Sequence, residues 1–404
     1  MPQKGKLSMR IIKTTVKNRK ILVLASVITA LAAPVAAITL SEILPDAYKY
    51  MTEAAKYSDI LTRTASSEND VNNGNLMLYI PQETVSDSET GINNPAEQKE
   101  ASLFIRNISA EKEDLSVFTA NSGEIYETTF NGSLGENFIN LKYGGQVRNC
   151  TDLSNEFVER ETTIPHNIVV ELYSEEPQVL IMHTHTTESY EMTEKSYFDS
   201  EYTSRSSDPA NGVVAVGAAI AEELSTAGIS VIHDGTIHDE QYTGAYVRSL
   251  ETVEKILEEY PSIKIVLDIH RDAIEDNGSR VSAITEINGR KAAQVMIISA
   301  ADDGTYGIPD YLENFHFACA FQQALELNYP TLTRPVLFQY CHYNQHTTTG
   351  SLLLEIGSHG NTVEQAVYSG HLVGKALANL FISERLYEQE VLRTMPRFFM
   401  DRLR

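Results

Sequence analysis

The sequence predicts an α/β protein in which helices flank a mostly parallel sheet. Three short, largely aliphatic runs at residues 178–182, 263–267 and 352–354 each lead into ionisable residues. Runs of about four to eight aliphatic residues with polar boundaries are typical of buried strands. From His166 onward they alternate with segments of helical periodicity, which indicates βα units. The carboxyl ends of such strands meet at one edge, where open α/β sheets place their ligands.

The individual elements follow His166 in chain order. Strands are expected at 167–172, 178–182, 229–233, 263–270, 290–300 and 352–356, and helices at 211–227, 246–260, 311–327 and 362–381. Gly228 suits the C-cap of the first helix because glycine readily takes the left-handed conformation found there. Pro261 ends the second helix because proline lacks the N–H that a helix needs.

Composition divides the chain into five regions. We predict a basic cytoplasmic leader at 1–20, a transmembrane anchor at 21–40, a variable or stalk region at 41–165, a catalytic domain at 166–383 and a tail at 384–404. All 11 histidines lie from His166 onward, which is why the chemistry is sought there. Short alternating patches within 101–162 indicate that the end of the stalk is rich in strands.

The N-terminal segment predicts a single-pass membrane protein with its catalytic domain outside the cytoplasm. Residues 21–40 carry no charge, and about twenty apolar residues are long enough to cross a bilayer. Basic residues precede this segment and none follows it closely, which places the N-terminus in the cytoplasm. The alternative is a cleaved signal peptide, because Val35-Ala36-Ala37 could serve as a small-residue cleavage site.

The charge pattern argues against a nucleic-acid partner. The net charge is −23 even though the leader is basic, so the rest of the chain is strongly acidic and shows no basic face. Three cysteines without Cys-x-x-Cys spacing give no sign of a disulfide framework in a chain this long.

His185, Glu188 and His270 are the candidate metal ligands. The first two lie at or just past the end of the 178–182 strand, and His270 ends the 263–270 strand. Imidazoles with a carboxylate suit a catalytic Zn²⁺ site, which keeps one coordination position open for water. On a continuing strand His183 would point to the same face as His185, so His183 is the alternative ligand.

Glu355 is the candidate catalytic residue. It follows three leucines, and an unpaired carboxylate buried in a central strand is costly. A general base that takes a proton from the attacking water would explain it, and burial would raise its pKa into a useful range. A structural salt bridge is the alternative explanation.

Two residues beside His270 complete the candidate site. Asp268 lies two residues before His270 and would share its face of a strand, where it could orient the imidazole. Arg271 could contact substrate or could pair with Asp272.

Four motifs together resemble the stage II sporulation protein P family. They are His183-Thr184-His185-Thr186-Thr187-Glu188-Ser189-Tyr190, Asp268-Ile269-His270-Arg271-Asp272, Thr285-Glu286-Ile287-Asn288-Gly289 and Leu354-Glu355-Ile356-Gly357-Ser358. The resemblance covers roughly 166–381. It implies a zinc-dependent peptidoglycan hydrolase with N-acetylmuramoyl-L-alanine amidase activity, and an endopeptidase activity on stem-peptide cross-links.

The resemblance also implies a setting and a fold. The setting is the sporulation septum, where stage II sporulation proteins D and M would be partners in remodelling wall during engulfment. The fold would be that of amidase-3-type zinc enzymes, whose ligands correspond to His185, Glu188 and His270 and whose catalytic carboxylate corresponds to Glu355. Only two residues separate His185 from Glu188, whereas those amidases place their glutamate further along the chain.

Two other functions fit parts of the pattern. An exported scaffold could bind wall glycan without cutting it, but it would not need the metal-ligand set. A zinc carbohydrate deacetylase would share the ligands and would release acetate.

Overall fold

The computed structural model describes residues 101–394, with side chains described as far as residue 387. The predicted leader, the segment 21–40 and the first part of the predicted stalk lie outside the described residues, as do residues 395–404. Among the helices of residues 101–394, none combines the length and apolar character needed to cross a bilayer. The predicted single-pass membrane localisation is therefore withdrawn. That prediction rested on residues 21–40, which lie outside the described range.

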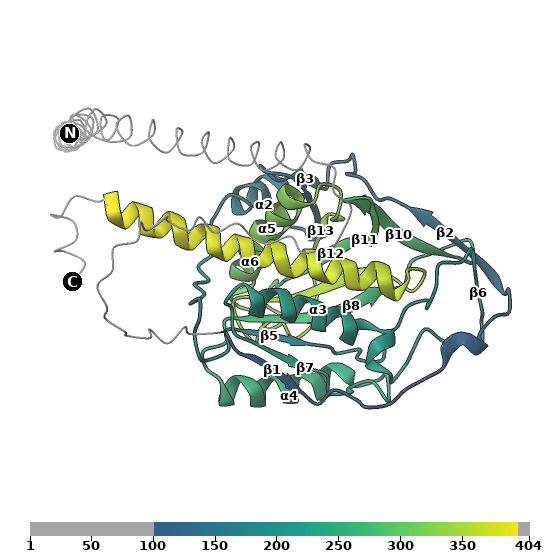
Figure 1. Cartoon of the computed structure of the whole chain (residues 1–404). Helices are drawn as coiled ribbons and strands as arrows, with labels where there is room; N and C mark the ends of the chain where they lie inside the picture. The colour runs from purple at the N-terminus through teal and green to yellow at the C-terminus, as the bar shows by residue number, and fades with distance from the viewer. Residues whose placement is uncertain (1–100, 395–404) are drawn as a thin grey trace, which may run out of the picture. The chain divides into compact units, whose positions relative to one another are not determined.

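A nine-stranded sheet forms the centre of the described chain (Figure 1). In spatial order its strands are β1 (Leu103–Arg106), β7 (Val231–Asp234), β5 (Val179–Met182), β8 (Ile265–Asp272), β14 (Ser351–Ser358), β12 (Val295–Ala301), β13 (Val336–Tyr340), β4 (Gln146–Asn149) and β3 (Phe138–Asn140). Neighbouring strands pair in parallel except β14 with β12 and β4 with β3. The prediction of a mixed α/β fold with a mainly parallel sheet is confirmed.

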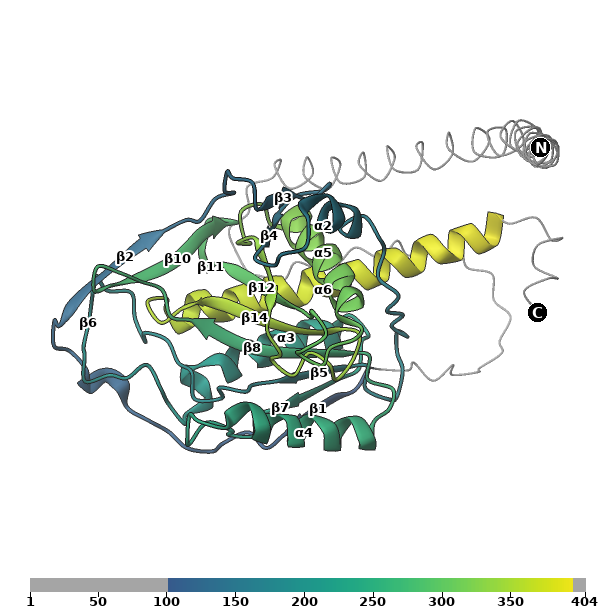
Figure 2. The same ribbon diagram turned by 180° about the vertical axis from the view of Figure 1, so that it is seen from behind.

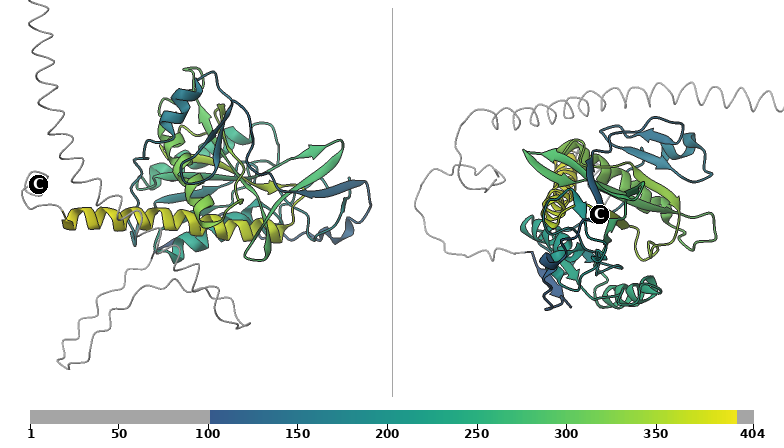
Figure 3. Two further views of the ribbon diagram at one scale, coloured as in Figure 1. Left: turned by 90° about the horizontal axis from the view of Figure 1, so that it is seen from above. Right: turned by 90° about the vertical axis from the view of Figure 1, so that its right-hand side faces the viewer.

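Helices cover both faces of this sheet. Helices α3 (Val213–Thr226), α5 (Tyr311–Asn328) and α6 (Val363–Thr394) pack on one face through the largest apolar cluster. Helix α4 (Ala245–Glu259) packs on the other face, where Val253 and Ile256 meet Leu180, Met182 and Val266. The right-hand view of Figure 3 shows α4 and α6 on opposite sides of the strands.

A smaller sheet lies beside the main one (Figure 2). It contains β11 (Arg290–Ala293), β10 (Ser279–Ile287), β2 (Gly123–Thr128) and β6 (Tyr197–Phe198), and β9 (Glu275–Asp276) pairs with β10. The strand predicted at 290–300 is thus two strands, β11 and β12, which belong to different sheets. Gln294 lies between them and binds the backbone of Phe130 and Thr331 through its side chain.

Residues 101–165 do not lie apart from the main sheet, although we assigned them to a stalk. They supply β1 at one edge and β4 and β3 at the other, and helix α2 (Asn155–Glu161) contacts α5. The boundary at 165 is therefore not a boundary of the sheet. Strands of three or four residues are too short to show a period, and their places are set by pairing with β7 and β13 much later in the chain.

Two predicted elements differ from the structure. Residues 167–172 form no strand; Ile168 and Val170 are buried in the core without ladder pairing. The last helix continues to Thr394, past the predicted domain end at 383. Figures 1 and 3 show the final turns of α6 extending beyond the sheets.

Candidate active site

Strands β8 and β14 bring three of the predicted site residues together. They pair in parallel with Asp268 opposite Leu353 and His270 opposite Glu355. Side chains alternate along a strand, so Asp268 and His270 share the face of Val266, which is the face covered by α4. The side chains of His270 and Glu355 therefore start from the same level of the sheet, on the same face.

The turn after β5 adds His185 and Glu188. Strand β5 ends at Met182, and a turn closes with the amide of Glu188 donating to the carbonyl of His185 at 3.0 Å. This turn places Glu188 Oε2 3.4 Å from Nδ1 of His270, where it also accepts a hydrogen bond of 3.1 Å from the amide of Arg271. Although burial opposes the shift, His270 and then the charges of Arg271 and Arg205 lower the pKa of Glu188 to about 2.

His185 lies beside His270 and packs against two tyrosines. Its ring stacks on Tyr242 with centroids 4.6 Å apart and meets the ring of His270 edge-on at 5.4 Å. Within the described part of the chain its Nδ1 is buried without a hydrogen-bond partner, and Asp239 Oδ2 lies 3.9 Å from it. An unpartnered buried nitrogen is costly to retain, which is the expected property of an atom that receives a ligand.

His183 does not join the group, although it was the alternative ligand. Its Nδ1 lies 3.0 Å from the carbonyl of Ile269 and its Nε2 3.0 Å from Nε2 of His233. Both ring nitrogens are therefore engaged inside the core, and burial lowers the pKa of His183 to about 4. The same-face argument failed because the strand ends at Met182, before the two histidines can alternate along it.

Asp268 lies against His270, as its position in the strand predicts. Its Oδ1 is 2.9 Å from Nε2 of His270, and Thr184 donates to both carboxylate oxygens, from its amide at 2.8 Å and its hydroxyl at 2.7 Å. Although burial opposes the shifts, these contacts lower the pKa of Asp268, and the carboxylates of Asp268 and Glu188 raise the pKa of His270.

Arg271 is occupied by the backbone. Its guanidinium donates to the carbonyls of Ser189, Ser204 and Asp272 and its side chain is buried. The carboxylate of Asp272 pairs instead with Arg334, at 2.8 Å. Arg271 therefore fixes the chain around the turn after β5, and neither predicted partner, substrate nor the Asp272 carboxylate, is needed to explain it.

Glu355 has the opposite environment to Glu188. Its Oε2 is buried and has no hydrogen-bond partner among the described residues. Burial, together with the negative charges of Glu188 and Asp272, raises the pKa of Glu355 to about 8, although His270 and Arg334 oppose the rise. Two neighbouring carboxyl groups whose pKa values are driven apart are characteristic of an acid–base centre.

Residues outside the predicted set also contribute. Asp239 accepts hydrogen bonds from Thr187 and from Arg205. Tyr246, in the first turn of α4, stacks parallel to His270 with centroids 6.4 Å apart. Neither residue lies at a strand end, so no periodic signal in the sequence pointed to them.

The donor types fit zinc, while their arrangement is not that of a formed metal centre. Within residues 101–394 no group of three His, Cys, Asp or Glu side chains is positioned to hold a metal ion. Two imidazoles and a carboxylate nevertheless match catalytic zinc ligands. The 3.4 Å between His270 Nδ1 and Glu188 Oε2 is close to the separation of roughly 3.3 Å expected for two ligand atoms bound tetrahedrally at about 2.0–2.1 Å from zinc. The unpartnered Nδ1 of His185 could complete such a set.

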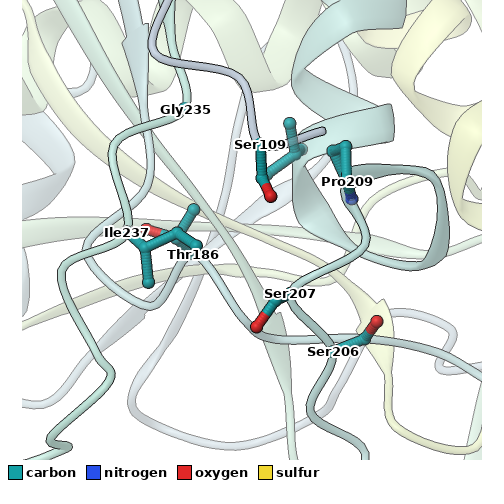
Figure 4. Close-up of a pocket in the computed structure, with 8 residues that line it drawn as sticks. Ser109, Thr186, Ser206, Ser207, Pro209, Gly235 and Ile237 are labelled. Atoms are coloured by element: carbon teal, nitrogen blue, oxygen red, sulfur yellow. The ribbon is translucent and has the colours of Figure 1, made fainter. Parts of the chain in front are cut away.

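A small pocket lies behind the turn that carries His185 (Figure 4). Its lining includes Thr186, Ser109, Ser207 and Ile237, and none of the predicted site residues. It is a feature separate from the cluster around His270.

The fold and the cluster together define an α/β protein with a buried His/Glu centre at the carboxyl ends of its parallel strands. The family model for stage II sporulation protein P (SpoIIP) matches residues 48–378. This chain therefore belongs to the stage II sporulation protein P family, as its motifs indicated. No curated protein matches it in sequence.

Several solved structures resemble part of the chain. The CwlD amidase from Clostridioides difficile, solved with the GerS lipoprotein, is 14% identical with a TM-score of 0.33, over 52% of this chain and 98% of that one. The N-acetylmuramoyl-L-alanine amidase AmiC2 of Nostoc punctiforme is 13% identical with a TM-score of 0.31, over 52% and 97%. The catalytic domain of CwlV from Bacillus (Paenibacillus) polymyxa var. colistinus is 12% identical with a TM-score of 0.27, over 52% and 98%. Likenesses this weak carry no argument about activity.

Proposed function

We propose that this chain is a zinc-dependent N-acetylmuramoyl-L-alanine amidase that acts on peptidoglycan during sporulation. The observation that carries the proposal is the pairing of Glu355 with His270 across β14 and β8, which sets a carboxyl of raised pKa beside two imidazoles and a carboxylate of lowered pKa. Among the described residues Glu355 forms no ion pair and its Oε2 has no hydrogen-bond partner, so a structural salt bridge does not account for it there. Membership of the stage II sporulation protein P family supports the setting.

In this proposal each side chain has one task. His185, Glu188 and His270 would hold zinc, which when bound supplies a Lewis acid for the amide carbonyl. Asp268 orients the His270 ring by contact with its Nε2. Glu355 takes a proton from the attacking water and returns it to the amide nitrogen, so that the bond between lactyl carbonyl and L-alanine breaks to give a carboxylic acid and a free amine.

The site must hold Glu355 unprotonated for it to act as the base. Its raised pKa describes the site without a cation, and a dication held by His185, Glu188 and His270 would favour the ionised carboxylate. The proposal therefore links metal binding to the protonation of Glu355, through charges that lie on neighbouring strands.

The test is to incubate the purified full-length protein with peptidoglycan, before and after chelation and with zinc restored, and to identify products by mass spectrometry. Zinc-dependent release of stem peptides with a free L-alanine amine is the expected result. Cleaved cross-links would establish the endopeptidase activity that the family resemblance implies. Released acetate would identify a carbohydrate deacetylase instead.

Binding without any product has two explanations, a scaffold or an enzyme that needs a partner. Stage II sporulation protein D is the partner that the resemblance implies, together with protein M. Repeating the assay with protein D separates the two explanations, because a scaffold stays without product. Continued absence of product in its presence would contradict the amidase proposal.

A further inference from the structure

Tyr246 lies at the centre of the candidate site, although no strand end carries it. It stands in the first turn of α4, the helix that covers this face of the sheet. Its ring is nearly parallel to that of His270, at 13° and 6.4 Å between centroids, and meets the ring of His185 edge-on at 5.6 Å. Tyr246 therefore contacts the rings of both predicted histidine ligands.

The hydroxyl of Tyr246 is an unused hydrogen-bond donor. Among residues 101–394 it has no hydrogen-bond partner, and it is not one of the buried unpartnered atoms, so it keeps access to solvent. Burial of the side chain and the charges of Asp268, Glu355 and Glu188 raise the pKa of Tyr246 well above that of a free tyrosine. A tyrosine hydroxyl is protonated at neutral pH and can donate one hydrogen bond.

The surroundings contact both the ring and the backbone of Tyr246. The ring of Tyr343 stacks on it at 5.3 Å, and its backbone carbonyl accepts hydrogen bonds from Asn344 Nδ2 at 2.8 Å and from Ser249 Oγ at 3.2 Å. Tyr343 and Asn344 both have left-handed backbone conformations, with φ of 42° and 54°. Two consecutive non-glycine residues in that region are strained, and the strained turn is what presents Tyr343 and Asn344 to Tyr246.

We propose that Tyr246 is a further catalytic residue, whose hydroxyl donates a hydrogen bond to the carbonyl oxygen of the scissile amide as water adds to it. The inference rests on the proposed amidase function. Water adds across the carbonyl, Glu355 carries its proton to the amide nitrogen, and the carbon–nitrogen bond breaks. Tyr246 keeps its own proton throughout and stabilises the negative charge that develops on the oxygen.

A fixed neutral donor suits this role. The charge on the oxygen is greatest in the transition state, so the hydrogen bond strengthens there and lowers the barrier more than it lowers the energy of bound substrate. Because Tyr343, Asn344 and Ser249 already hold Tyr246, little reorganisation is needed when the charge appears. A purely structural tyrosine would need its ring but not its hydroxyl.

The test compares Tyr246→Phe with wild type in the zinc-loaded full-length protein on peptidoglycan. Loss of one oxyanion donor is expected to lower kcat by about 100-fold or more, with KM changed by less than about threefold. The melting temperature and zinc affinity should stay unchanged, because the ring and its stacking remain. Tyr260→Phe, at the other end of α4 and packed on Phe104, is the matched control and should keep wild-type kcat.

A second measurement does not depend on turnover. A phosphonate analogue of the scissile amide carries tetrahedral charged oxygens, so its affinity should fall in Tyr246→Phe by about the factor lost in kcat/KM, while affinity for the released peptide stays the same. Wild-type kcat in Tyr246→Phe, or equal loss of analogue and peptide binding, would overturn the assignment. An inactive wild-type protein, with protein D present, would instead overturn the proposed function on which the assignment rests.

Discussion

Glu355 and His270 face each other as register partners on two parallel strands. A register irregularity follows in β14 between Glu355 and Ser358, where Gly357 takes a φ of +65°. Glu355 is therefore the last residue of β14 before the regular ladder is interrupted, and it lies directly opposite His270. The geometry that supports catalysis is set by backbone pairing, and substitutions at Glu355 can change its chemistry without moving the strand.

Glu355→Gln is expected to abolish activity without destabilising the fold. Removal of a general base costs about 10²–10⁴-fold in rate. Among the residues that the structure describes, one buried oxygen of this carboxyl has no partner, so the neutral amide should leave the melting temperature equal or higher. Release of stem peptides and thermal unfolding measure the two effects. Glu364→Gln, at an exposed position in the first turn of α6, is the matched control. Wild-type cleavage by Glu355→Gln would exclude it as the base.

Asp268→Asn is expected to weaken zinc binding by about 10–100-fold. Asp268 contacts Nε2 of His270 and accepts two hydrogen bonds from Thr184, so an amide would lose the charge that orients the ring and would face Thr184 with a donor. Competition with a chelator measures the affinity directly. Asp276→Asn on β9, where the carboxylate is exposed, should bind zinc as wild type does. Equal affinities in both variants would mean that Asp268 does not support a metal ligand.

The sequence was most informative where strands are long and aliphatic. The predicted elements at 178–182, 211–227, 246–260, 263–270, 311–327 and 352–356 correspond to β5, α3, α4, β8, α5 and β14. The short strands β1, β3 and β4 were not placed in the sheet, because they lie at or next to its edges and mix exposed with partly or fully buried residues, whereas β5, also four residues long, is buried throughout. The boundary at 165 was placed because all 11 histidines lie after it, which does not show where the sheet begins.

The site was predictable only where it depends on strand ends. His185, Glu188, His270 and Glu355 lie together because the carboxyl ends of β5, β8 and β14 meet, which follows from parallel pairing. Tyr246 reaches them from a helix, through a contact that no sequence period records. His183 was indistinguishable from His185 until the end of β5 at Met182 was known.

Gly217→Ala is expected to destabilise the protein, although replacing glycine with alanine inside a helix normally stabilises it by about 0.5–1 kcal/mol. An added Cβ would lie 2.8 Å from both His183 Cε1 and His233 Nε2, so α3 packs against the buried histidine pair only through glycine. Overpacking of this kind costs about 1–3 kcal/mol, and a net loss of about 1–2 kcal/mol is expected. Urea unfolding at neutral pH measures it. An unchanged or higher midpoint would show that the two histidines shift to accommodate the added methyl group without loss of stability.

Stability is expected to fall below pH 6.5 partly because of His359. Its side chain is buried, and its Nδ1 has no hydrogen-bond partner among the described residues. Its Nε2 lies 3.4 Å from Glu275, and its backbone amide donates to the carbonyl of Asp272. Burial, and then the charges of Arg271 and Arg280, lower the pKa of His359 to about 4, although Asp272 opposes the shift.

The sign follows from proton binding in the two states. Between pH 6.5 and 4 the unfolded chain protonates this histidine and the folded chain does not, so falling pH favours unfolding. Keeping His359 neutral therefore contributes to the free energy of unfolding. This contribution, up to about 3 kcal/mol, is fully present above pH 6.5 and is lost as the pH falls to 4. His359→Gln removes the titration, so its unfolding free energy should fall less steeply than that of wild type over this range. Denaturant unfolding at several pH values measures the slopes, and equal slopes would show that His359 is protonated in the folded state as readily as in the unfolded chain.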